Sequence, residues 1–260
     1  MRALCLEHGL KIYADLEPTI LRTFDKLLSS KFFTENPLGR SMAKLVAKLL
    51  WFLPHGVVLD CETALKFVDV LDKIGSKIAV GSCICKVALN RRKDPLDVDV
   101  VILAGIKAWA ERKPGYRYIS SEELKRYLLE WNKIGLIHSV YACCRMGKLT
   151  FVICNCDPEI CVPVRCYKTW RAALFKGPKV AVVDGSLCQG CGECVKVCAF
   201  EASSLQNGKA FVDEEKCMGC GVCLRFCKGN ARKLVPREDY RWPRFMRKFM
   251  EEIEKVQKAS

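Results

Sequence analysis

The sequence predicts an α+β protein with a mostly helical N-terminal part, a central helix followed by a β-hairpin, and a short cysteine-rich C-terminal module. Apolar residues at helical spacing dominate the first 75 residues. In the centre, a helix with clear start and stop signals precedes two strand-like runs, residues 136–144 and 148–154. Near the end, eight cysteines repeat one spacing twice. These changes of composition divide the chain into residues 1–75, 76–178, 179–236 and 237–260.

The composition indicates in which cellular compartment the protein works and what charge its binding partner carries. The chain has 260 residues, 18 cysteines and a formal charge of +14. Its first ten residues lack the apolar segment of a secretion signal, so we expect a cytoplasmic protein whose thiols bind metal rather than form disulfides. The longest uncharged run, residues 49–59, is too short to cross a bilayer. The positive balance favours an acidic partner protein or an anionic surface.

The N-terminal region should form three helices. Residues 18–28 have helical spacing, and a loop at residues 36–39 separates them from a second helix that begins near Ser41. That helix carries Lys44 and Lys48, which fit either a basic face against an anionic surface or the solvated stripe of a core helix. Asp60 is placed to cap a third helix.

The central helix has strong signals at both ends. Ser120 and Glu123 form a capping box, and Gly135 is a natural C-terminal stop. The two strand-like runs that follow are joined by a turn at residues 145–147. Helix plus hairpin resembles the second half of a winged helix, a fold that occurs in DNA-binding proteins and also as a plain packing module.

The hairpin register predicts where one histidine lies. If Cys144 faces Leu149, the numbers of paired residues sum to 293 and His138 faces Asn155. His138 should then lie beside two cysteines of the second strand, Cys154 and Cys156. It is our candidate catalytic residue, as a proton donor.

Two Cys-x-Cys segments form a candidate metal site. Cys83 and Cys85 form the first, and Cys154 and Cys156 form the second; in each, residues i and i+2 share one face of an extended chain. Cys161 is a fifth thiol and a rival to Cys156. Three outcomes stay open: a third [4Fe–4S] cluster, a zinc ion, or unmetallated thiols.

The doubled motif points to iron–sulfur chemistry. Cys188, Cys191, Cys194 and Cys198 give C-x2-C-x2-C-x3-C, and Cys217, Cys220, Cys223 and Cys227 repeat it at a constant offset of 29. Three thiolates at this spacing can surround one cubane, whereas structural zinc takes two separated pairs. Residues 180–236 therefore resemble the bacterial-type ferredoxin with two [4Fe–4S] clusters.

That resemblance implies crossed ligands, because in the family the fourth cysteine of each run ligates the other cluster. One cluster would then be held by Cys188, Cys191, Cys194 and Cys227, and the other by Cys217, Cys220, Cys223 and Cys198. The residue after each fourth cysteine is commonly proline, but here it is alanine or lysine. The added N–H groups and positive charge should raise the cluster potentials.

A second resemblance covers residues 60–236. The segments Cys83-Ile-Cys85-Lys86, Gly135-Leu-Ile-His138 and Cys154-Asn-Cys156 resemble a group of iron–sulfur proteins of anaerobes. That group couples Cys-x-Cys-Arg, Gly-Leu-Val-His and Cys-Asn-Cys-Cys runs to a terminal two-cluster ferredoxin. Here lysine replaces the arginine, and the second cysteine run is thinned.

The favoured function is electron transfer by a ferredoxin-like subunit that docks to an acidic redox partner protein or a larger oxidoreductase complex. One alternative is an oxidoreductase that binds substrate at the metal site near His138, and another is a redox-sensing DNA-binding regulator. The chain lacks the fingerprints of nucleotide- and flavin-binding loops, and nucleic acid is the least favoured partner.

The last segment reads as a basic amphipathic helix. Between residues 241 and 256, apolar side chains follow i, i+3, i+4, i+7 spacing with arginines and lysines between them. Such a helix can lie on the inner face of a membrane, dock to a partner, or pack onto its own protein.

Overall fold

A seven-stranded mixed sheet forms the body of the protein. The computed structural model describes residues 2–49, 54–142, 150–247 and 250. The strands of the sheet are β1 (His55–Leu59), β2 (Ile78–Ser82), β3 (Asp97–Ile102), β4 (Arg117–Tyr118), β5 (Ile137–Ala142), β6 (Thr150–Cys156) and β7 (Leu174–Phe175). Their order is β4-β2-β3-β6-β5-β1-β7, and every neighbouring pair is antiparallel except β1 and β7.

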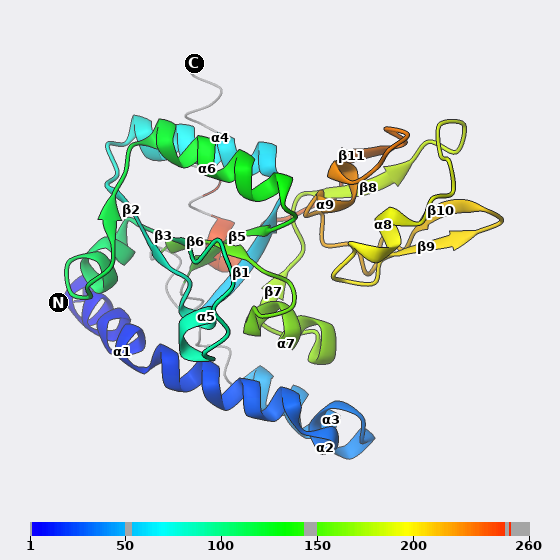
Figure 1. Ribbon diagram of the computed structural model, residues 1–260. Coiled ribbons are helices and arrows are strands. Elements are labelled where there is room, and N and C mark those ends of the chain that lie inside the picture. The colour runs from blue at the N-terminus through cyan, green and yellow to red at the C-terminus, as the bar shows by residue number, and fades with distance from the viewer. Residues whose placement is uncertain (1, 50–53, 143–149, 248–249, 251–260) are drawn as a thin grey trace.

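Helices cover both faces of this sheet, which explains why its central strands are apolar at consecutive positions (Figure 1). One face packs against α4 (Cys61–Lys73) and α6 (Ser121–Lys133). The other packs against α1 (Arg2–Ser29), α5 (Ile84–Ala88), the π-helix η1 (Ile106–Ala110) and α7 (Val162–Trp170). Two further helices, α2 (Lys31–Thr34) and α3 (Pro37–Leu49), follow α1.

Two predicted helix starts, at Asp60 and Ser120, agree with the structure, whereas the second helix begins at Pro37 rather than near Ser41, so most of the expected loop at residues 36–39 is helical. The Asp60 side chain accepts the Thr63 N–H at 3.2 Å at the start of α4. Ser120 accepts the Glu123 N–H at 3.1 Å at the start of α6. No helix among the described residues is long and apolar enough to cross a membrane.

The sheet extends across the boundary expected near residue 75. Strand β1 lies between β5 and β7, and α4 packs beside α6, so this part of the N-terminal region shares one core with residues 76–178. Only long-range pairing reveals this, because local sequence patterns carry no information on which distant strands become neighbours.

The helix and hairpin predicted for the centre are present, and the register is the predicted one. His138 pairs with Asn155, and the sum of 293 holds from Ile137 to Tyr141 before a one-residue shift. The pair that set this register, Cys144 and Leu149, lies outside the described residues. The surroundings differ from a winged helix, because β5 and β6 are inner strands of the seven-stranded sheet.

The C-terminal module lies beside the sheet and has two similar halves (Figure 1). It contains β8 (Lys179–Val183), α8 (Glu193–Lys196), β9 (Ser203–Gln206), β10 (Lys209–Val212), α9 (Val222–Arg225) and β11 (Arg232–Pro236). Strands β8 and β11 form one small antiparallel sheet, and β9 and β10 form the other. The start of α9 follows that of α8 by 29 residues, the offset of the cysteine repeat.

The described part of the tail packs onto the protein itself. Residues 244–247 are helical, and Phe245, Met246 and Met250 are buried in the core cluster that includes α4 and α6. The ring of Phe245 lies 5.4 Å from that of Phe175. The apolar side chains described here are therefore not free for a membrane, and residues 251–260 of the expected helix lie outside the described residues.

Candidate functional site

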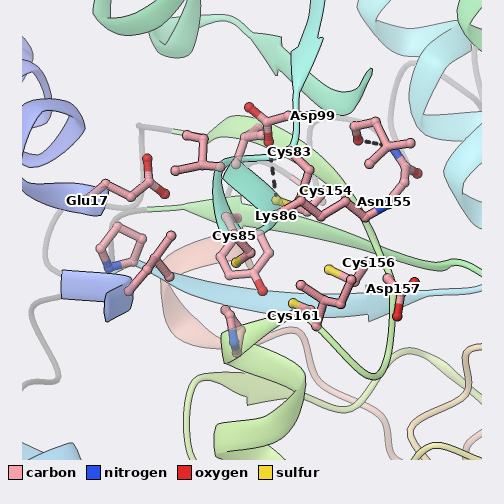
Figure 2. Close-up of a pocket in the computed structure, with 18 of the residues that line it drawn as sticks. Glu17, Cys83, Cys85, Lys86, Asp99, Cys154, Asn155, Cys156, Asp157 and Cys161 are labelled. Atoms are coloured by element: carbon pink, nitrogen blue, oxygen red, sulfur yellow. Dashed lines mark hydrogen bonds between the residues drawn. The ribbon is translucent and has the colours of Figure 1, made fainter. Parts of the chain in front are cut away.

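Five thiols from three segments converge in one pocket between the sheet and α1 (Figure 2). Cys83 and Cys85 lie at the start of α5, Cys154 and Cys156 on β6, and Cys161 directly before α7. Hydrogen bonds join their side chains in a chain from Cys83 through Cys85, Cys161 and Cys156 to Cys154. The structure thus brings together the two Cys-x-Cys segments and the rival Cys161, across more than fifty residues of intervening sequence.

The thiols do not share one protonation behaviour. Hydrogen bonds from neighbouring thiols hold the pKa values of Cys85 and Cys156 well below the ordinary cysteine value. The pKa values of Cys83, Cys154 and Cys161 are raised, because the same neighbours compete for the negative charge and burial adds to the effect. Ionisation of all five thiols in this buried pocket therefore needs a cation.

The cavity in this pocket measures about 80 Å³. One buried water needs only about 10–15 Å³ in such a measure, so a larger group fits. Tyr141 borders the cavity; its hydroxyl is buried and has no hydrogen-bond partner among the described residues. An unsatisfied buried hydroxyl is costly, and this one faces the pocket in which the thiols meet.

Two carboxyl groups that the sequence analysis missed also line the pocket. Asp99 on β3 accepts hydrogen bonds from the Tyr116 hydroxyl at 2.7 Å and from the Cys154 thiol at 3.6 Å, and burial raises its pKa to about 7. Glu17 on α1 accepts the Trp109 indole N–H at 3.2 Å, and burial raises its pKa to about 8. A charged residue inside an apolar strand was the available signal for Asp99; nothing in the sequence marks Glu17.

Lys86, the counterpart of the arginine in the upstream resemblance, is fully buried beside the thiols. Its ammonium group donates to the carbonyl oxygens of Lys93 at 3.0 Å and Pro95 at 2.7 Å. It therefore ties the α5 segment, which carries two of the thiols, to the loop before β3.

His138 does not lie beside these thiols. Successive side chains of a strand point to opposite faces. His138 therefore faces α4 and α6, as Val140 and Ala142 do, whereas Cys154 and Cys156 face the pocket, whose lining also includes Asn155. His138 is fully buried, its Nδ1 lies 2.6 Å from the Asn155 Oδ1, and burial lowers its pKa. The expected proton donor at the thiol site is thus on the wrong face of the sheet.

The two halves of the C-terminal module present their cysteines in the same way. The Ala202 N–H donates to the Cys198 sulfur at 3.2 Å, and the Ala231 N–H donates to the Cys227 sulfur at 3.3 Å. Glycines in the cysteine loops adopt positive φ angles, and a Cβ on Gly219 would lie 2.1 Å from a backbone carbonyl oxygen. Backbone N–H groups that point at thiolates are the hydrogen bonds that cluster ligands require.

The two cysteine runs also contact one another. Burial raises the pKa values of Cys220 and Cys223, and the nearby thiols of Cys198 and Cys217 add to the effect. The fourth cysteine of the first run therefore lies among the cysteines of the second. Among the described residues, no group of three or more His, Cys, Asp or Glu is placed to hold a single metal ion. This applies to the eight repeat cysteines as well as to the thiol pocket.

Comparison with known proteins agrees with this geometry. Residues 181–228 match the 4Fe-4S dicluster domain family. Ferredoxin-2 of Desulfomicrobium norvegicum is 62% identical over 29 residues, which are 11% of this chain and 49% of that ferredoxin. The chain thus spans about half the length of this curated relative. The protein therefore contains a ferredoxin-type domain with two [4Fe–4S] clusters.

Proposed function

We propose that this protein transfers electrons between the two clusters of its ferredoxin domain and a third metal centre held in the thiol pocket. The observation that carries the proposal is the convergence of five thiols in one buried pocket. Four thiols suffice for a [4Fe–4S] cluster, so one is left over. We propose a cluster rather than zinc, because zinc has no redox chemistry and could not exchange electrons with the clusters of the ferredoxin domain.

The packing supplies a route between the two sites. Helix α7 begins directly after Cys161 and carries Tyr167, whose ring meets that of Phe200 edge to face at 5.7 Å between centroids. Phe200 follows Cys198 by two residues. Cys161, Tyr167 and Phe200 belong to one core cluster, so the route is continuous packed protein. In the crossed assignment, which the proximity of Cys198 to Cys220 and Cys223 supports, this route starts at the second cluster.

The opposite side of the ferredoxin domain suits a redox partner. Cys191 is exposed, and the nearby Lys196 is exposed and forms an ion pair with Glu193 at 2.9 Å. Lys228, near the same glutamate, is exposed as well. We infer that an acidic redox protein, or an acidic face of a larger oxidoreductase, docks here and exchanges electrons with the first cluster.

An oxidoreductase is the second candidate function, and the unpartnered hydroxyl of Tyr141 favours it. A small molecule bound at the third centre would give this hydroxyl the partner that it lacks. His138 has no part in this version, because it faces the other side of the sheet.

Anaerobic iron analysis tests the third centre. We expect about twelve irons per chain in the wild type and about eight in Cys85→Ser, which removes a central thiol of the chain of hydrogen bonds. Comparing Cys156→Ser with Cys161→Ser identifies the spare thiol. Cys61→Ser is the control, since this cysteine is partly buried on α4 outside the pocket. Eight irons in the wild type, with no other metal present, would refute the proposal.

A further inference from the structure

Arg232 is a buried cation with an incomplete set of partners. It opens β11, and its side chain is only 5% exposed. Its Nη2 donates to the Ser203 hydroxyl at 3.2 Å, while its Nη1 is buried without a hydrogen-bond partner among the described residues. No ion pair within the described chain includes it. A buried guanidinium with an unpaired N–H is costly unless an acceptor or a counter-charge lies against it.

The position of Arg232 in the repeat shows where that counter-charge should be. Ser203 and Arg232 are separated by 29 residues and are therefore equivalent positions of the two halves. Each directly follows an alanine whose N–H donates to the fourth cysteine of its run. The hydrogen bond between Ser203 and Arg232 thus joins the two halves at equivalent positions. Only one of these positions carries a charged side chain, so the positive charge breaks the symmetry of the halves.

The backbone next to this hydrogen bond holds one ligand of each cluster. Cys198 accepts the Ala202 N–H, directly before Ser203, and Cys227 accepts the Ala231 N–H, directly before Arg232. Cys198 and Cys227 are the fourth cysteines of the two runs, so they serve different clusters whichever way the fourth ligands cross.

We propose that Arg232 is the internal counter-ion shared by the two clusters, and that its Nη1 donates a hydrogen bond to a sulfur atom of the bound pair. Each oxidised cluster with four thiolates carries a net charge of about −2. The clusters can therefore supply the counter-charge for the Arg232 guanidinium. Reduction adds an electron to a cluster, so a fixed cation and a hydrogen bond stabilise the reduced state more. Arg232 therefore raises both midpoint potentials. This inference rests on the two ferredoxin clusters and is independent of the thiol pocket.

Redox titration of the full-length protein, followed by EPR, tests the proposal. Arg232→Gln should shift both midpoint potentials to more negative values. Arg232→Lys keeps the charge and should shift them less. Lys233→Gln is the matched control, because it removes the same charge from the next residue of β11, which is exposed. It should move the potentials much less than Arg232→Gln.

Two results would overturn the proposal. One is an Arg232→Gln protein that holds its ferredoxin iron and has the potentials of the Lys233→Gln control. The other comes from the wild-type protein, so it does not depend on the folding of a variant. After labelling with 15N-arginine, pulsed EPR of the reduced clusters should detect an arginine nitrogen coupled to a cluster. Absence of that coupling contradicts a hydrogen bond from Nη1, whatever the variants do.

Discussion

Lys179 fastens the ferredoxin domain to the body of the protein, and replacing it by methionine should loosen that junction. Its ammonium group on β8 lies 3.1 Å from the Asp60 carboxylate and 2.7 Å from that of Glu62, at the start of α4. The Asp60 side chain is 4% exposed and that of Glu62 is 62% exposed. Hydrogen bonds with Lys179, and then with Lys66, lower the pKa of Glu62 to about 2.

The size of the effect follows from burial. Losing the buried, charge-assisted contact with Asp60 should cost about 1.5–3 kcal/mol, and losing the exposed contact with Glu62 less than about 1 kcal/mol. Asp60 keeps its hydrogen bonds to the Thr63 N–H and hydroxyl, which limits the penalty of an unpaired buried charge. We therefore expect Lys179→Met to lower the free energy of unfolding by about 2–4 kcal/mol.

Denaturant titration with two probes measures this loss. Cluster absorbance reports the ferredoxin domain, and tryptophan fluorescence reports the body. In Lys179→Met, the cluster signal should be lost at lower denaturant than in the wild type. Lys176→Met is the control: Lys176 pairs at 3.1 Å with Glu215, which is 95% exposed, so its loss should cost less than about 1 kcal/mol. Equal effects of the two variants would refute the claim that the Asp60 contact stabilises the junction.

Two further predictions concern the docking surface and the pocket. Lys196→Glu combined with Lys228→Glu should slow reduction of the clusters by an acidic donor protein at low salt, as measured by stopped-flow absorbance. High salt should abolish the difference from the wild type, because it screens exposed charges. A slower reduction that persists at high salt would indicate structural damage instead. Burial raises the pKa of Glu17 to about 8, so unfolding releases its proton and the stability of the wild type should fall by a few kcal/mol between about pH 5 and about pH 8. In urea titrations, the free energy of unfolding of Glu17→Gln should not fall over this pH range. If the variant and the wild type show the same dependence of stability on pH, Glu17 is ionised in the native protein.

The sequence allowed the site residues to be predicted better than the fold around them. Spacing alone identifies the eight ferredoxin cysteines, because the fixed geometry of a cubane demands that motif. The pairing of His138 with Asn155 also follows from the turn that joins the strands. The seven-stranded sheet could not be predicted in this way, since β1 finds its neighbours β5 and β7 across 80 or more residues.

The error about His138 has a simple physical origin. A register states which residue is opposite, whereas the face on which a side chain lies is set by alternation along the strand. His138 is opposite Asn155, and its neighbours Cys154 and Cys156 therefore point to the other face. The same alternation places Asp99 on the thiol side, because it pairs with Cys154. Applied to the sequence, this rule alone would have removed His138 from the thiol site, whereas Asp99 could be placed there only from the pairing of β3 with β6.

The arrangement of the cysteines gives the proposed electron route a direction in space. Cys191 in the first run is exposed to solvent, whereas Cys220 in the second packs against the core that contains Cys156 and Cys161. In the crossed assignment, the first cluster would therefore face outward and the second would face the pocket. On the proposed route, an electron from a docked partner would reach the outer cluster first. Arg232, whose bond to Ser203 lies next to the two fourth cysteines, would stabilise the reduced state of either cluster.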